Sequence, residues 1–389
     1  MRYTAYTNAK IYTPDGVVPA GTLVVTESGK IHAIHTEPFT ASEADVVHDL
    51  QGKAILPGLI DVHTHGAMGY SASDGSYESL DAFSKYHAAH GTTSFLATTR
   101  TDSDERISIA LRSAADAINR GVSGAEIAGI HLEGPFIDRI RAGAQDPSHI
   151  VLPTESLMAR YQALSDNHIR LVTLAPEVEG GMDAVKWYAS RGVRVSIGHS
   201  NATLEEVKRA VSLGASHTTH HFNGMSPLHH REPGVAGSGL MLPELTTEII
   251  ADGFHVRPEL IKFLFEVKGS MGVCMITDSV EAADLPNGTY GDVVVQDGRI
   301  TLADGSSLAG SSLNTLQAVR NVIAYTGRSL EQVLPSMTEV PARQAGISDR
   351  KGSLVPGKDA DFIVVSSCDK LELERTYVRS REVWNAKQL

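Results

Sequence analysis

Two histidines lie two residues apart where a short apolar run ends, His63 and His65 in the segment LPGLIDVHTHG. In a β-strand, residues i and i+2 point to the same side, so both imidazoles can converge on one point. A divalent metal ion is the natural occupant of such a point. The alternative is two unrelated surface histidines in a chain that has 17 of them. On this segment alone the two readings are evenly balanced.

Polar side chains recur where later apolar runs end. They are His131 and Glu133 in IAGIHLEG, His199 in VRVSIGHS, His220 and His221 in HTTHHFNG, His255 in TTEIIADGFH and Asp278 in VCMITDS. A lone strand histidine is usually a hydrogen-bonded core residue, but so many would each need a buried partner. The pattern therefore predicts a metal site. Its nitrogen and oxygen donors suit zinc, iron, manganese or cobalt rather than calcium or magnesium.

A metal ion of this kind can lower the pKa of a water molecule toward ~7 and so create a nucleophile. The reaction then needs a general base that is not itself a ligand. Asp278 is the candidate, because it ends its run in TDS with no histidine beside it. The alternative is an aspartate that caps the segment after it.

A second group of functional side chains lies in the segment HHFNGMSPLHHREPG, residues 220–234. Its proline and glycine residues predict a long loop. The loop carries Asn223, His229, His230 and Arg231, and arginine with amide and imidazole donors is suited to a phosphate or carboxylate. The alternative is a surface loop with a solvated arginine.

The elements that must position these residues alternate between apolar runs and amphipathic segments such as DERISIALRSAADAINR. Nearly all-apolar strands joined by helices indicate a parallel sheet covered by helices. About eight units fit into residues 57–345, which predicts a (β/α)8 TIM-like barrel, with a doubly wound open sheet as the alternative. Alternating strands in residues 1–56 and 346–389 predict one small β-sandwich domain built from both termini.

Composition narrows the possible partners. A net charge of -12 and a pI near 5.8 argue against a nucleic-acid or acidic-membrane partner. Two cysteines give no disulfide framework, and we see neither a signal peptide nor an apolar stretch long enough to span a membrane. We therefore expect a cytoplasmic protein.

At this point the motifs carry a resemblance. LPGLIDVHTHG and PGKDADFIVV resemble the amidohydrolase superfamily, a metal-bearing barrel with a small β-sandwich. HLEGPF, IGHSNA, THHFNGMSPLHHREPG, DGFHV, ITDS and LAGSSLNTLQAVRN are similar to its N-acetylglucosamine-6-phosphate deacetylase family. The resemblance covers nearly the whole chain, and it implies hydrolysis of the N-acetyl group of N-acetyl-D-glucosamine 6-phosphate to an amino sugar phosphate and acetate.

The resemblance also implies roles for individual residues. Glu133, His199 and His220 would be the main metal ligands, and His63 and His65 would hold a second ion that Glu133 bridges, giving one or two ions per subunit. Asp278 would pass a proton from the water to the leaving amine, and His255 would polarise the acetyl carbonyl or hold the sugar. Asn223, Gly224 and Arg231 would bind the phosphate, with the arginine supplied by the other subunit of a homodimer. Ala144, Leu308, Ala309 and Gly310 would contact the sugar.

The chain departs from the family beside the sugar. Where the family commonly has a lysine and a histidine after HLEGPF, this chain has Ala142 and Gln145. The galacto epimer of the sugar therefore stays open as substrate. Within the superfamily, an enzyme acting on a cyclic amide or an N-acyl amino acid is a further alternative. A catalytically silent scaffold is the alternative outside enzymes, and the joint presence of ligands, base and anion loop speaks against it.

Overall fold

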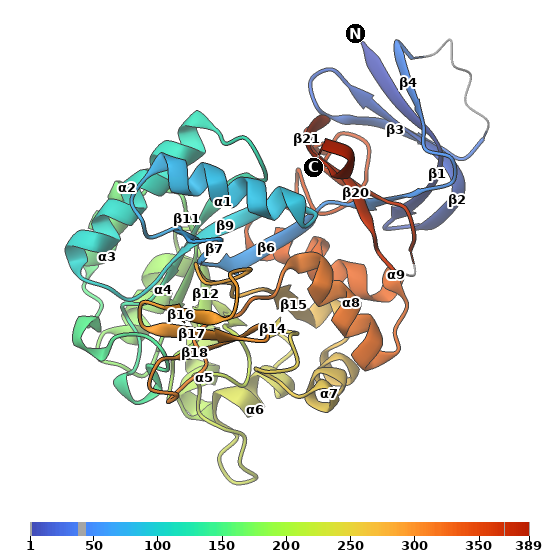
Figure 1. The fold of residues 1–389 in the computed structure, drawn as a ribbon. Coiled ribbons are helices and arrows are strands. Elements are labelled where there is room, and N and C mark those ends of the chain that lie inside the picture. Colours follow the sequence, from blue (N-terminus) through green and yellow to red (C-terminus); the bar gives the residue numbers. More distant parts are fainter. Residues whose placement is uncertain (1, 38–43, 369, 389) are drawn as a thin grey trace.

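The computed structural model describes residues 2–37, 44–368 and 370–388, and a barrel of parallel strands surrounded by helices dominates it (Figure 1). Eight strands follow one another around the barrel in chain order. They are β6 (Leu59–Thr64), β9 (Thr92–Thr99), β10 (Glu126–Glu133), β11 (Ile169–Leu174), β12 (Arg194–Ile197), β13 (Ala215–Thr218), β14 (Thr246–Ile250) and β15 (Val273–Ile276). The apolar runs that the sequence predicts as strands coincide with these elements.

Side chains and backbone together close the ring between its last and first strands. The backbone N–H of Asp278, just beyond β15, donates to the carbonyl of His63 in β6 at 2.9 Å. The fully buried Asp61 accepts from the Thr277 hydroxyl at 2.6 Å. These bonds place the ends of β6 and β15 side by side, so His63 and Asp278 must lie close together.

Helices cover the outside of the barrel and begin at well-formed caps. Ser103 accepts from the backbone N–H of Arg106 at the start of α2, and Thr203 forms a reciprocal capping box with Glu206 at the start of α5. The helices are α1 (Tyr77–Ala89), α2 (Asp104–Arg120), α3 (Glu155–Leu164), α4 (Gly181–Ala189), α5 (Leu204–Ser212), α6 (Gly234–Met241), α7 (Pro258–Lys268), α8 (Thr315–Thr326), α9 (Leu330–Val333) and α10 (Glu339–Gln344). Within the described ranges, none of them is long and apolar enough to cross a membrane.

Strands from both ends of the chain form one separate eight-stranded sheet (Figure 1). Its members are β1 (Tyr3–Thr13), β2 (Gly16–Thr26), β3 (Ile31–His35), β4 (Val46–Asp49), β5 (Ala54–Pro57), β19 (Phe362–Val365), β20 (Leu373–Val378) and β21 (Arg381–Asn385). The antiparallel pairing of β5 with β19 joins the two termini, and buried Leu23, Ile55 and Phe362 pack beneath it. The predicted α/β class, a (β/α)8 barrel with a small β-domain from both termini, is confirmed.

Two small sheets were not predicted. A three-stranded antiparallel sheet, β16 (Gly288–Tyr290), β17 (Val293–Gln296) and β18 (Arg299–Leu302), follows β15, and a short hairpin, β7 (Gly66–Ala67) and β8 (Tyr70–Ser71), follows β6. Buried Val293, Val295 and Ile300 form a small core of their own for the three-stranded sheet. It lies over the mouth of the barrel, because Val293 and Leu302 line the pocket described next.

Candidate active site

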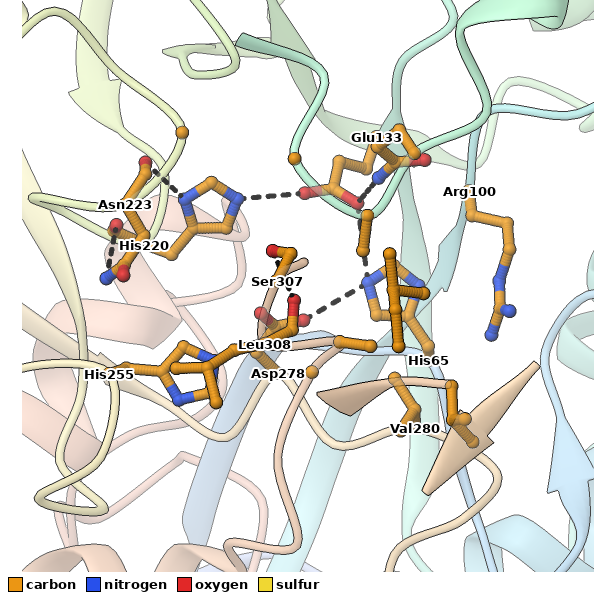
Figure 2. Close-up of a pocket in the computed structure, with 18 of the residues that line it drawn as sticks. His65, Arg100, Glu133, His220, Asn223, His255, Asp278, Val280, Ser307 and Leu308 are labelled. Atoms are coloured by element: carbon orange, nitrogen blue, oxygen red, sulfur yellow. Dashed lines mark hydrogen bonds and ion pairs between the residues drawn. The ribbon is translucent and has the colours of Figure 1, made fainter. Parts of the chain in front are cut away.

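The carboxyl ends of the barrel strands open into one pocket (Figure 2). It brings together polar residues that the sequence predicted from separate runs: His65, Glu133, His199, His220, His255 and Asp278. The predicted sugar and phosphate contacts within this chain, Ala144, Asn223, Gly224, Leu308, Ala309 and Gly310, line the same pocket.

Backbone conformation turns several of these side chains toward the pocket. His199, His220 and Asp278 each have a positive φ, of 47°, 28° and 51°. This region disfavours residues with a Cβ and is retained mainly where the surrounding structure requires it. All three lie just beyond the ends of their strands, so the chain turns sharply where the functional groups are needed.

Glu133, the last residue of β10, is the centre of the first ligand group. Its Oε1 lies 3.3 Å from Nε2 of His199 and 3.3 Å from Nε2 of His220, and the two nitrogens are 3.1 Å apart. Donors about 2.1 Å from a tetrahedral ion are roughly 3.4 Å from one another. The spacing of this group therefore fits a divalent metal ion.

His63 and His65 form a second group around the same carboxylate. Their Nε2 atoms are 3.3 Å apart, with that of His63 3.3 Å from Glu133 Oε1 and that of His65 3.4 Å from Oε2. Oδ1 of Asp278 lies 3.4 Å and 3.3 Å from the same two nitrogens. Figure 2 shows Glu133 between His220 and His65, with the Asp278 carboxylate also turned toward His65.

Hydrogen bonds on the far sides of the imidazoles fix which nitrogen faces the centre. Nδ1 of His199 donates to the carbonyl of Arg141 at 2.8 Å, and Nδ1 of His220 donates to that of Asn223 at 3.0 Å. A carbonyl only accepts, so Nδ1 carries a proton and, in the neutral ring, the Nε2 lone pair points at Glu133. Either a metal ion or a second proton must then lie between each Nε2 and the carboxylate, and the spacing of the group fits a metal ion.

Electrostatics leads to the same conclusion. Burial alone would raise the pKa of the Glu133 carboxyl, but His63 and the bonds from His199 and His220 bring it well below its usual value. Burial alone would lower the pKa of His63, but Asp278, Glu248 and Glu133 raise it well above its usual value. Three buried carboxylates thus surround one imidazole, and the site favours added positive charge.

Sequence reasoning missed Glu248, which lies inside β14 with no exposed surface. Its carboxylate accepts from Nδ1 of His63 at 2.9 Å, from Nε2 of His217 at 3.0 Å and from the backbone N–H of His220 at 3.0 Å. The available signal was a glutamate inside the apolar run TTEII. A carboxylate behind a ligating histidine orients the ring and raises its basicity.

His131, another strand-end residue, is a structural histidine. Its Nδ1 donates to the carbonyl of Val62 at 3.0 Å, and its Nε2 lies 2.7 Å from the Thr173 hydroxyl. Burial keeps the pKa of His131 well below its usual value, so the ring is neutral. With both nitrogens bonded to protein groups, His131 is not available as a ligand.

Two residues predicted to bind the substrate, His255 and Arg231, lie in different places relative to the pocket. His255 lines the pocket, and Asp252 fixes the ring by accepting from its Nδ1 at 2.7 Å. Arg231 does not line the pocket of its own chain: it is exposed, next to His230, in the loop before α6 that extends away from the barrel (Figure 1). One chain alone therefore does not bring Arg231 to the predicted phosphate contacts.

The fold is a (β/α)8 barrel, and its strand ends carry histidines and a carboxylate at the spacing of metal ligands. These two features define the class of the protein, a barrel enzyme that holds a divalent ion. The sequence matches the amidohydrolase family over residues 54–383. The chain therefore belongs to the amidohydrolase family.

Individual relatives narrow the comparison. The chain is 39% identical over 364 residues to N-acetylglucosamine-6-phosphate deacetylase of Bacillus subtilis (strain 168), covering 92% of this chain and 91% of the relative. It is 35% identical over 342 residues to N-acetylgalactosamine-6-phosphate deacetylase of Escherichia coli O157:H7, covering 87% and 89%. A solved structure of a variant of N-acetyl-D-glucosamine-6-phosphate deacetylase from Mycobacterium smegmatis, in complex with N-acetyl-D-glucosamine-6-phosphate, superposes with a TM-score of 0.91 at 27% identity, covering 98% and 100%.

Proposed function

We propose that this protein hydrolyses the N-acetyl group of N-acetyl-D-glucosamine 6-phosphate to D-glucosamine 6-phosphate and acetate. The observation that carries the proposal is one pocket in which Glu133, His199 and His220 lie at ligand spacing. A further carboxylate, Asp278, lines the same pocket beside the His63–His65 pair. Similarity to deacetylases over about nine-tenths of the chain supports the substrate.

Glu133, His199 and His220 would hold the first divalent ion, and His63 and His65 with Glu133 a second, weaker one. We propose zinc, because imidazole nitrogen and carboxylate oxygen suit it, while iron, manganese and cobalt accept the same donors. A bound ion would polarise the acetyl carbonyl and lower the pKa of a water molecule.

Asp278 would carry the proton that the reaction must move. Burial would raise the pKa of Asp278, but the neighbouring His63 and His65 bring it below its usual value, so the carboxylate is ionised. It would take a proton from the attacking water and give it to the amine nitrogen as the C–N bond breaks. The products are then acetate and the free amine.

The rest of the pocket would hold the sugar phosphate. His255, held by Asp252 through Nδ1, would turn Nε2 toward the acetyl carbonyl or the sugar, and would need a proton on both ring nitrogens to donate to the carbonyl. Asn223 and Gly224 would meet the phosphate, and Ala144 with the segment from Leu308 to Gly310 would contact the sugar ring.

Arg231 would complete the phosphate site across a homodimer, since its loop extends away from its own pocket. We expect Arg231→Ala to cost at least ~2 kcal/mol, roughly 30-fold, in kcat/KM for the phosphorylated sugar. Mixing Arg231→Ala with Asp278→Asn in equal amounts distinguishes the source of the arginine. If Arg231 acts across the interface, about half of the dimers are mixed and each of these has one complete site, so the mixture regains about a quarter of the wild-type sites once the subunits exchange. Recovery of no activity would place Arg231 outside the partner's pocket.

The defining experiment measures acetate release from the 6-phosphates of N-acetylglucosamine and N-acetylgalactosamine and from both unphosphorylated sugars, with metal content determined on the same sample. The proposal predicts the highest kcat/KM for the gluco 6-phosphate. A preference for the galacto 6-phosphate would favour the second candidate, which the similarity to a relative named N-acetylgalactosamine-6-phosphate deacetylase and the presence of Gln145 support. No preference for phosphate would instead point to a cyclic amide or N-acyl amino acid.

A further inference from the structure

Gln145 lies between the pocket and the Glu133 carboxylate, in the loop that follows β10. Its Nε2 is 2.6 Å from Oε2 of Glu133, and its Oε1 accepts from the backbone N–H of Thr101 at 2.8 Å. Thr101 is buried just beyond the end of β9. The side chain therefore joins Glu133 to the rigid end of the neighbouring strand.

The orientation of this amide is fixed by the chemistry of its two partners. A backbone N–H can only donate, so it must face the carbonyl oxygen of the side chain. A carboxylate can only accept, so it must face the NH₂ group. If the amide were turned over, its NH₂ group would face the N–H of Thr101 and its carbonyl oxygen would face the Glu133 carboxylate. Both bonds would be lost, so Gln145 has one stable orientation.

The bond from Gln145 distinguishes the two oxygens of Glu133. Oε1 lies 3.3 Å from Nε2 of His199, of His220 and of His63, whereas Oε2 faces His65 alone among these rings, at 3.4 Å. Gln145 binds Oε2, the oxygen on the side of His65. A glutamate can bridge two ions only when its carboxylate plane is held, and the bond from Gln145 at 2.6 Å holds Oε2 beside His65.

We propose that Gln145 is a positioning residue that holds Oε2 of Glu133 toward His65 and thereby completes the second metal site, which His63, His65 and Glu133 form together. This inference rests on the proposed function, because it takes Glu133 as a ligand of both ions. The first site depends less on Gln145, since His199 and His220 are held independently through their Nδ1 atoms.

The test is Zn²⁺ binding to the full-length chain at a series of buffered free Zn²⁺ concentrations, with bound zinc counted by elemental analysis. Gln145→Met keeps the length of the side chain but neither donates nor accepts through nitrogen or oxygen. We expect the second equivalent to bind about 10- to 100-fold more weakly and the first to change by less than about 3-fold. Gln145→Ala serves as a second variant should the methionine disturb the loop.

Asp146→Ala is the matched control. This neighbouring residue is 56% exposed, and its carboxylate contacts its own turn: it accepts from the backbone N–H of Ser148 at 2.8 Å and lies 3.8 Å from Nε2 of His149. Both zinc equivalents should bind it as they bind the wild type.

Three results would overturn the inference: equal weakening of both equivalents, unchanged binding of both with a raised KM for the sugar phosphate, or a wild type that binds one equivalent only. The second result would make Gln145 a substrate contact. A wild type that binds no zinc would instead contradict the proposed function itself, so the two failures are distinguishable.

Discussion

Glu248 offers the sharpest test of how this site is held together, because no part of it is exposed to substrate or solvent. Its carboxylate accepts three N–H groups, from the rings of His63 and His217 and from the backbone of His220. His220 belongs to the proposed first metal site and His63 to the second. A change at Glu248 should therefore alter metal binding without touching the substrate.

The size of the effect follows from these three bonds. Glu248→Ala would leave three buried donors unpaired at roughly 1–3 kcal/mol each, which approaches the whole stability of a typical domain. Glu248→Gln is milder, because its carbonyl oxygen can still accept from His63 and His220. Its NH₂ group can then donate to Nε2 of His217, whose proton moves to Nδ1, a position without a partner among the described residues. The main loss in the variant is the negative charge of the carboxylate. This charge strengthens the bonds from His63 and His220 by about 1 kcal/mol each.

We expect Glu248→Gln to fold and to bind Zn²⁺ about 10- to 100-fold more weakly than the wild type. The assay is zinc binding at buffered free Zn²⁺, with circular dichroism and urea unfolding to confirm that the fold is intact. Glu244→Gln is the matched control, since Glu244 is exposed on the loop before β14. A folded Glu248→Gln protein with wild-type zinc affinity would refute the reasoning that Glu248 supports the ligands.

Three further changes should have separable effects. Asp278→Asn should keep the first zinc equivalent while kcat falls about 10²- to 10⁴-fold in acetate release, and turnover within 10-fold of wild type would remove Asp278 as the proton carrier. The double variant His63→Ala, His65→Ala should bind one zinc equivalent instead of two by elemental analysis; unchanged stoichiometry would exclude the pair as ligands. Lys351→Met should lower the free energy of unfolding, measured in urea at pH 7, by about 3–5 kcal/mol. The Lys351 side chain is 1% exposed and its Nζ lies 3.1 Å from Oε2 of Glu126, so the variant leaves a carboxylate without its buried cation. Burial would raise the pKa of Glu126, but Lys351 and Arg350 lower it below its usual 4.5, so this stabilisation should be lost as the pH falls below that value.

Much of the site could be predicted because parallel strands bring their carboxyl ends to one edge. That rule alone was enough to place Glu133, His220 and Asp278 near one another, although they lie more than 140 residues apart along the chain from first to last. Alternating strands at both termini likewise predicted the small sheet that β5 and β19 complete.

The supporting contacts could not be predicted, because they depend on pairs that meet only after folding. Glu248 is 185 residues from its partner His63, and Gln145 is 44 residues from Thr101. Neither carries a spacing signal, since a mid-strand glutamate and a loop glutamine are common in any sequence. The positive φ at His199 and His220 was equally invisible, because it arises from the turn beyond each strand rather than from residue type.

The most direct test of the central claim follows both products in time. The chain loaded with zinc, the same chain after complete removal of zinc by a chelator, and the chain after zinc is restored are each given N-acetyl-D-glucosamine 6-phosphate. We predict equal amounts of acetate and D-glucosamine 6-phosphate from the loaded chain, loss of both without metal, and recovery when zinc returns. Acetate release that survives complete metal removal, or no release from the fully loaded chain, would contradict the account.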